Sequence, residues 1–120
     1  PSFWLRESAF TLDWSVESPA DVAAVMVAHD ALGHRQGIVV ANPVPADQAW
    51  EREEHERVLN EAFAAAERAG VTGKAVTPFL LGTIVELSGG RSLEVNLDLA
   101  RNNVRVAGEI ARAWAAQAGA

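Results

Sequence analysis

Three asparagines near the C-terminal end of the chain are the residues whose type and spacing most suggest a function. Asn96, Asn102 and Asn103 lie in a segment that otherwise has the pattern of a helix. Asparagine is a mediocre helix former, because its side-chain amide competes with the backbone for hydrogen bonds. Three of them in one helix therefore indicate a polar stripe with a role. The alternative is that buried asparagines satisfy backbone groups of an adjacent segment.

Three further residues have types and positions that could serve a site. Asn42 ends an apolar run, and ligands of open α/β sheets bind outside the carboxyl ends of strands, although a turn formed with Pro43 is the alternative role. Thr77 could help to bind phosphate at a helix N-terminus or could be an ordinary cap. Lys74 is the only lysine, and a desolvated lysine can attack a carbonyl, but its position just before a helix cap predicts a surface role.

The composition excludes several kinds of site and partner. The chain has 120 residues and no cysteine, which excludes disulfides and thiolate metal sites. Its three histidines lack the spacing of a metal-binding set, so we expect no metal ligand here. A net charge of −6 without a basic patch argues against nucleic acid as a partner. No apolar run is long enough to span a membrane, and a cytoplasmic location is expected.

Four helices are predicted from caps and apolar spacing. Ser18 and Pro19 begin the first, which ends near Gly33. The second runs from about residue 48 to 69 with Asp47 as its cap. The third begins with Thr77 as its cap and ends near residue 87, before two glycines. Ser92 caps the last, whose apolar residues recur at spacings of four and three: Leu93, Leu97, Ala100, Val104, Ala107, Ala111 and Trp114.

The strands are the unsettled part of this prediction. Residues 37–42 form a continuous apolar run, which predicts a strand buried on both faces, and residues 2–6 predict a short second strand. One or two strands do not make a sheet. We therefore expect a helix-rich α/β segment, residues 1–120, that belongs to a larger domain or is completed by another copy. Tryptophans left uncovered would mark an interface.

Several of these segments together resemble the C-terminal portion of the pseudouridine-5′-phosphate glycosidases, a family that includes the indigoidine-synthase-A-like proteins. The resemblance follows nearly the whole chain in order. It is carried by residues 32–33, 37–45, 69–74, 76–81, 84–93, 96–97, 102–103 and 107–111.

The resemblance implies both a fold and an activity. The family fold is an α/β/α sandwich, assembled as a homotrimer with manganese in its site. The implied reaction is the reversible cleavage of the carbon–carbon glycosidic bond of pseudouridine 5′-phosphate, which gives uracil and ribose 5-phosphate. The family's Schiff-base lysine, acidic proton donor and metal-site aspartate lie in its N-terminal portion and match nothing here. We therefore expect no catalytic residue or manganese ligand in this chain, and no activity from the chain alone.

The resemblance also matches Asn96 to the family asparagine that contacts uracil. An amide presents a donor and an acceptor in one plane, which complements the edge of a uracil ring. The position is near the positive end of a helix dipole, where it suits negative charge developing on a departing base. Two alternatives remain open. One is a non-catalytic, self-associating binding module, and the other is the indigoidine-synthase-A-like branch with a related phosphorylated base–sugar substrate.

Overall fold

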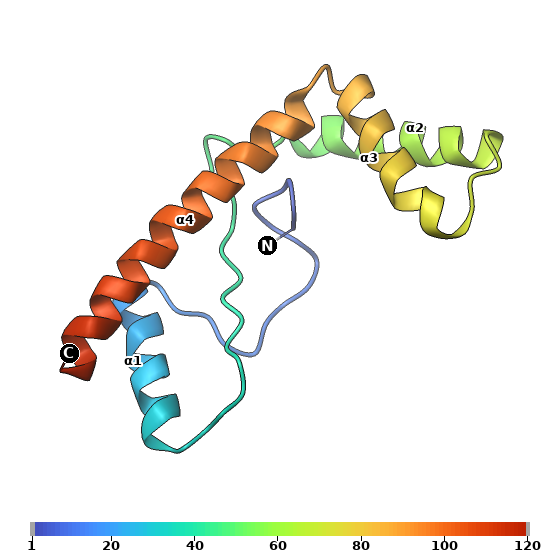
Figure 1. Cartoon of the computed structure of the whole chain (residues 1–120). Helices are drawn as coiled ribbons and strands as arrows, with labels where there is room; N and C mark the ends of the chain where they lie inside the picture. The colour runs from blue at the N-terminus through green and yellow to red at the C-terminus, as the bar shows by residue number, and fades with distance from the viewer. Residues whose placement is uncertain (1, 120) are drawn as a thin grey trace.

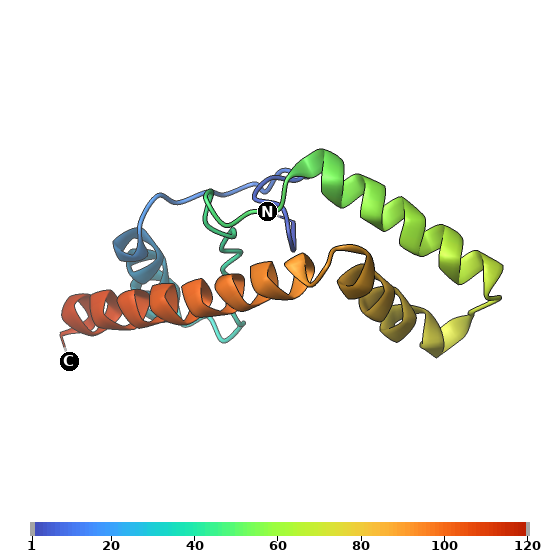
Figure 2. The same ribbon diagram turned by 90° about the horizontal axis from the view of Figure 1, so that it is seen from above.

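One long helix joins two groups of elements, which lie at its opposite ends. The computed structural model describes residues 2–119. Its elements are α1 (Pro19–Ala31), α2 (Arg52–Arg68), the short 3₁₀ helix η1 (Gly73–Ala75), α3 (Val76–Leu87) and α4 (Arg91–Ala118). The α2–α3 hairpin meets the N-terminal end of α4, and α1 packs beside its C-terminal half (Figure 1). Seen from above, irregular segments occupy the space between these two groups (Figure 2).

The first helix begins as predicted. The Ser18 hydroxyl accepts a hydrogen bond from the Asp21 N–H, and the Asp21 carboxylate accepts one from the Ser18 N–H at 2.9 Å. This reciprocal capping box satisfies two backbone donors that the helix itself leaves free. Gly33 follows the helix at φ +72°, a conformation that favours glycine. Local sequence signals therefore determine where α1 begins and ends.

The second helix begins later than predicted, at Arg52. Asp47 does not cap it, because the preceding residues are held in a turn: the N–H groups of Gln48 and Ala49 donate to the Pro45 carbonyl. Glu51 is the cap instead. Its carboxylate accepts the N–H groups of Glu53 and Glu54, and these hydrogen bonds lower the pKa of Glu51.

The predicted caps of the last two helices are also wrong. The 3₁₀ turn of η1 leads directly into α3, so Thr77 lies inside the helix, exposed, and does not cap it. The last helix begins one residue before Ser92, with Gly90 at φ +89° as its cap. Ser92 is buried, and its N–H donates to the Ser88 hydroxyl. The two-glycine break before α4 is confirmed, since Gly89 also has positive φ.

The predicted strands do not form within the described residues. Residues 37–42 are irregular and residues 3–6 form bends, and Val39 is 93% exposed. A strand requires a partner for its backbone N–H and C=O groups. Residues 2–119 supply no second strand that could pair with residues 37–42. The predicted helix-rich character is therefore confirmed, whereas the buried strand stays a prediction that residues 2–119 alone do not confirm.

A small core lies where the N-terminal segment, the α2–α3 hairpin and the start of α4 meet. Its buried members are Leu5, Val44, Trp50, Val58, Ala62, Ile84 and Val95. The rest of the molecule is open. Its radius of gyration is 18.3 Å, whereas a compact domain of this length has one of about 14 Å. Its accessible surface is 8454 Å², about 2,200 Å² more than a compact protein of this mass exposes.

The predicted apolar stripe on α4 faces solvent rather than this core. Leu93 is 51%, Leu97 47% and Val104 75% exposed, whereas Val95 on the opposite side is fully buried. The helix therefore has two apolar faces instead of the one expected. One packs inward on the core, and the other is not covered by any of residues 2–119. None of the helices in residues 2–119 is long and apolar enough to cross a bilayer.

The two faces predict effects of different size for the same substitution. Val95→Ala removes buried methyl groups and should lower the free energy of unfolding by about 2 kcal/mol. Val104→Ala, on the uncovered face, should change it by less than about 0.5 kcal/mol. Urea denaturation of both variants measures the difference. An equal loss of stability in the two variants would contradict this assignment of the faces.

Candidate functional site

Asn96 lies in the second turn of α4 and is exposed. It is about 60° around the helix from Leu93, at the border between the uncovered apolar face and the inward face that carries Val95. Within the described part of the chain, no hydrogen bond engages its amide. Asn102 and Asn103 differ in this respect, since both of their amides are bonded. Asn96 is therefore free to contact a ligand.

Asn102 and Asn103 hold an irregular segment against α4. The Asn42 amide donates to the Asn103 side-chain oxygen at 2.9 Å, and the Asn102 amide donates to the Pro43 carbonyl at 3.3 Å. The Arg105 guanidinium donates in turn to the Asn102 oxygen at 2.8 Å. Asn102 therefore matches the alternative given above, because its amide satisfies a backbone carbonyl of another segment, and Asn103 holds the same segment through the Asn42 side chain. The partners could not be deduced from the sequence, because they lie about sixty residues apart.

A further hydrogen bond and a buried side chain complete this anchor. The Arg6 guanidinium donates to the Val44 carbonyl at 3.0 Å, and the Val44 side chain is fully buried. The chain is therefore fixed at residues 42–44 and exposed just before them. Asn103 is seven residues from Asn96, about 10.5 Å along the helix and on the same side. The helix thus places Asn42 and Asn96 on one side of the molecule, about two helical turns apart.

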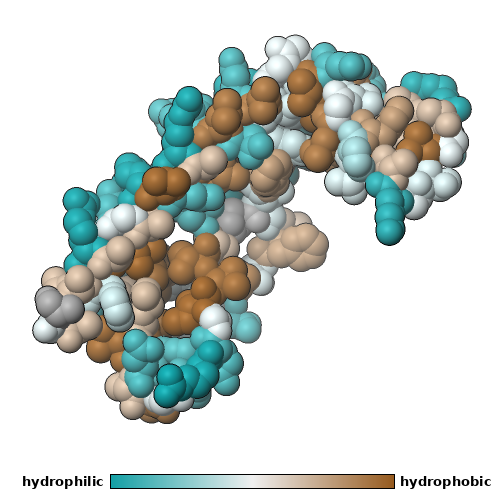
Figure 3. All heavy atoms as spheres, in the orientation of Figure 1, coloured by the Kyte–Doolittle hydropathy of each residue, from teal (hydrophilic) through white to brown (hydrophobic). Residues whose placement is uncertain are grey.

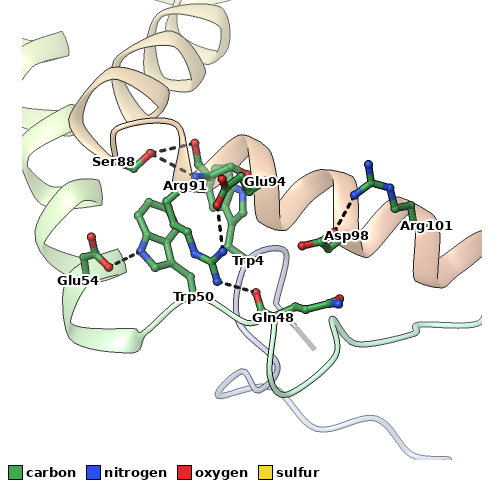
Figure 4. Close-up of polar contacts among 10 residues, drawn as sticks. Trp4, Gln48, Trp50, Glu54, Ser88, Arg91, Glu94, Asp98 and Arg101 are labelled. Carbon is green, nitrogen blue, oxygen red and sulfur yellow. Dashed lines mark hydrogen bonds and ion pairs between the residues drawn. The ribbon is translucent and has the colours of Figure 1, made fainter.

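The first turn of α4 is held in place by hydrogen bonds to two other segments of the chain. The Trp4 indole N–H donates to the Ser92 carbonyl at 3.0 Å, and the Arg91 guanidinium donates to the Gln48 carbonyl at 3.2 Å. Figure 4 shows Arg91 between Gln48 and Glu94. Since Asn96 is one turn further along, these contacts fix the part of the helix from which its side chain projects.

An aromatic cluster of Trp4, Trp50 and His55 packs next to this turn. The rings of Trp4 and Trp50 meet edge to face at 6.0 Å, and the His55 ring lies within 6 Å of both. The Trp50 indole N–H donates to the Glu54 carboxylate, as Figure 4 shows. Burial lowers the pKa of His55, and the nearby Arg52 charge adds to this effect, while Glu56 opposes it. The folded state therefore favours the neutral form of the His55 side chain.

Lys74, Thr77, His29 and His34 do not lie near Asn96. Lys74 and Thr77 are exposed at the start of the α3 region, at the far end of the α2–α3 hairpin. The rings of His29 and His34 lie 5.1 Å apart at the end of α1. Within residues 2–119 no group of three or more His, Cys, Asp or Glu side chains could hold a metal ion. The described residues therefore do not by themselves form a metal centre.

The cluster predicts how stability depends on pH. A histidine whose pKa is lowered in the folded state favours folding above its ordinary value of 6.5, and this contribution is lost as the pH falls. The free energy of unfolding should therefore decrease between pH 7 and about pH 5.5. The decrease should be smaller in His55→Gln. Denaturation over this range tests it, with His34→Gln, an exposed histidine, as the control. A pH slope unchanged in His55→Gln, or reduced as much in His34→Gln, would contradict the assignment.

Comparisons with known proteins find similarity along nearly the whole chain. The family described as indigoidine synthase A like protein matches residues 1–113. The chain is 53% identical over 117 residues to a pseudouridine-5′-phosphate glycosidase of Frankia alni, a match that covers 98% of the chain and 32% of that protein. It is 47% identical over 115 residues to one of Saccharopolyspora erythraea, covering 96% of the chain and 38% of that protein. The chain thus spans about a third of the length of these curated relatives.

A solved structure has the same arrangement of elements. It is the prealnumycin C-glycosynthase AlnA in complex with ribulose 5-phosphate, with a TM-score of 0.84 at 26% sequence identity. The match covers 98% of this chain and 39% of that one. The open arrangement of helices therefore occurs as part of a larger structure.

Proposed function

The chain belongs to the family of indigoidine synthase A-like proteins, and we propose that it forms the C-terminal third of a pseudouridine-5′-phosphate glycosidase. The intact enzyme would reversibly cleave the bond between the ribose and carbon 5 of uracil. The names of the two relatives, at 53% and 47% identity, support this activity. The C-glycosynthase structure supports a sugar phosphate as one half of the substrate.

The observation that carries the role of this chain is the free amide of Asn96 beside an uncovered surface. The amide can donate to a uracil carbonyl and accept from the ring N–H in the same plane. When the carbon–carbon bond breaks, the electron pair is left on the base and delocalises onto a carbonyl oxygen. A donor fixed in the second turn of α4, near the positive end of the helix dipole, stabilises that charge. Asn96 therefore recognises the base and assists its departure.

The bond-breaking chemistry belongs to the rest of the protein in this proposal. A lysine that forms a Schiff base with the sugar, an acid that protonates the base and the carboxylate ligand of a manganese ion would all come from the part that this chain does not match. Because the described residues do not gather a metal-binding set, no step through manganese is assigned to them. We also propose that the intact enzyme is a cytoplasmic homotrimer, as the family resemblance implies.

The exposed segment before Asn42 has a role in the same proposal. Residues 37–41 are apolar, irregular and uncovered, and their carboxyl end is fixed on α4 through Asn42 and Pro43. In the intact protein we place them as a strand in the parallel sheet of an α/β/α sandwich. The sheet would supply the hydrogen bonds that this chain alone lacks. Asn42 would then lie outside the end of a strand, where ligands of such folds bind.

A second candidate function rests on the exposed apolar surface itself. A chain that leaves about 2,200 Å² more surface open than a compact protein could be a self-associating binding module without catalytic activity. The unpartnered Asn96 amide favours the enzyme instead, because self-association requires no free amide at this position.

The test uses a full-length chimera in which this chain replaces the matching third of the Frankia alni relative. Asn96→Ala should reduce the cleavage rate of pseudouridine 5′-phosphate by about 10- to 100-fold, as expected when one hydrogen bond to developing charge is lost. Asn60→Ala, at an exposed asparagine of α2, is the matched control and should leave the rate unchanged.

Two results would contradict the proposal. A folded chimera that does not cleave pseudouridine 5′-phosphate would remove the assigned activity. An Asn96→Ala chimera as active as the parent, with unchanged KM, would remove the role of Asn96. The isolated chain should show no turnover, and activity from it would mean that residues such as Lys74 take part in the chemistry.

A further inference from the structure

The uncovered face of α4 has the regular spacing of a surface that packs against another helix. Its residues recur at alternating intervals of four and three: Leu93, Leu97, Ala100, Val104, Ala107 and Ala111. This is the seven-residue repeat that keeps one stripe of a helix against a partner helix. Three of the six are alanines, whose small side chains allow close approach. We call these six residues the α4 stripe.

The border of the α4 stripe on one side is charged and already paired within the chain. Arg91 pairs with Glu94, Asp98 with Arg101 and Arg105 with Glu109. These pairs lie about 80–160° around the helix from the stripe and mark the solvent-facing side. The other border carries Asn96 and Asn103 and leads to the buried face. The stripe is therefore an apolar surface between a solvated side and the asparagines.

The α4 stripe is one of several uncovered apolar surfaces, and together they are too extensive for a single helix pairing. Residues 10–16 expose Phe10, Leu12, Trp14 and Val16, and residues 38–40 are exposed as well. Figure 3 shows hydrophobic residues along α4 and on the concave side between α4 and α1. The excess surface of about 2,200 Å² greatly exceeds the roughly 800 Å² that each partner buries in a standard interface.

The size of the uncovered apolar surfaces decides between two possible partners for the α4 stripe, a second copy of the chain and the remaining part of the longer protein. A second copy paired along α4 would cover the α4 stripe but leave residues 10–16 and 38–40 open. The remaining part of the longer relatives, of which this chain matches only 32–38%, is large enough to cover all of these surfaces at once. It is also the part that must lie next to Asn96 if this residue contacts the substrate.

We propose that the α4 stripe is the surface on which a helix of the catalytic portion of the longer protein packs, so that Asn96 lies at the joint between the two portions. This inference rests on the proposed function for the identity of the partner. Base recognition then depends on correct packing of the stripe, because the partner helix and the uracil site share one border of α4. The stripe thus couples assembly of the protein to formation of its site.

The experiment compares one substitution in two contexts, the isolated chain and the Frankia alni chimera described above. Val104→Glu adds a charge to the α4 stripe at a position that is 75% exposed in the chain alone. It should leave the thermal midpoint of the isolated chain unchanged and lower that of the chimera by at least about 4 °C. Ala116→Glu, on the exposed side of α4 away from the stripe, is the matched control and should be neutral in both.

A second measurement does not require the charged variant to fold. The chain has no cysteine, so Val104→Cys introduces a single thiol whose labelling rate reports access to the α4 stripe. The rate should fall at least about tenfold in the chimera relative to the isolated chain. An Ala116→Cys thiol should react at similar rates in both, and the unsubstituted chimera provides the background from cysteines of the Frankia alni portion.

The outcomes separate this inference from the proposed function. A Val104 thiol that reacts equally fast in both contexts overturns the inference. So does self-association of the isolated chain that Val104→Glu abolishes while the chimera is unaffected, because a second copy is then the occupant. Protection of the Val104 thiol in a chimera that fails to cleave pseudouridine 5′-phosphate supports the packing surface and contradicts only the assigned activity.

Discussion

The structure depends on α4, because within residues 2–119 both α1 and the α2–α3 hairpin contact this helix and the two groups do not contact each other. The α2–α3 hairpin packs at its N-terminal end and α1 at its C-terminal half, and the Gln117 amide near its last turn donates to the Ala20 carbonyl at 3.0 Å. Trp4 and Arg91 fix its first turn, and the asparagine pair in its middle holds the segment at Pro43. A helix of 28 residues is long enough to serve all of these roles while leaving a second apolar face free.

Features that depend on neighbouring residues could be predicted from the sequence, and features that depend on distant ones could not. The capping box at Ser18 and the two glycines before α4 act within a few residues, so both predictions hold. The start of α2 was predicted too early, because a turn at Pro45 and the contact between Trp50 and Trp4 hold the chain out of the helix. The spacing on α4 revealed an apolar stripe but not its exposure, since periodicity gives a face and not its partner.

The same reasoning explains what could be foreseen of the site. The helical asparagines were recognisable because asparagine is unfavourable inside helices, and the structure separates their roles by their hydrogen bonds. Asn102 and Asn103 bind a neighbouring segment, whereas the Asn96 amide is free. The strand expected at residues 37–42 has the right composition but lacks a partner among residues 2–119. The missing strand and the uncovered α4 stripe have one physical cause: no other part of residues 2–119 packs against either of them.

The chain is in this view the recognition part of an enzyme rather than its reactive part. It supplies a rigid helix, an amide at a defined place and apolar surfaces that bring this amide to the reacting groups. The measurement that tests this account most directly is a crystal structure of the full-length chimera with uracil and ribose 5-phosphate bound. The account predicts the Asn96 amide within about 3 Å of the uracil edge and the α4 stripe covered by a helix of the remaining portion. A base bound away from Asn96, or an α4 stripe still open to solvent, would contradict it.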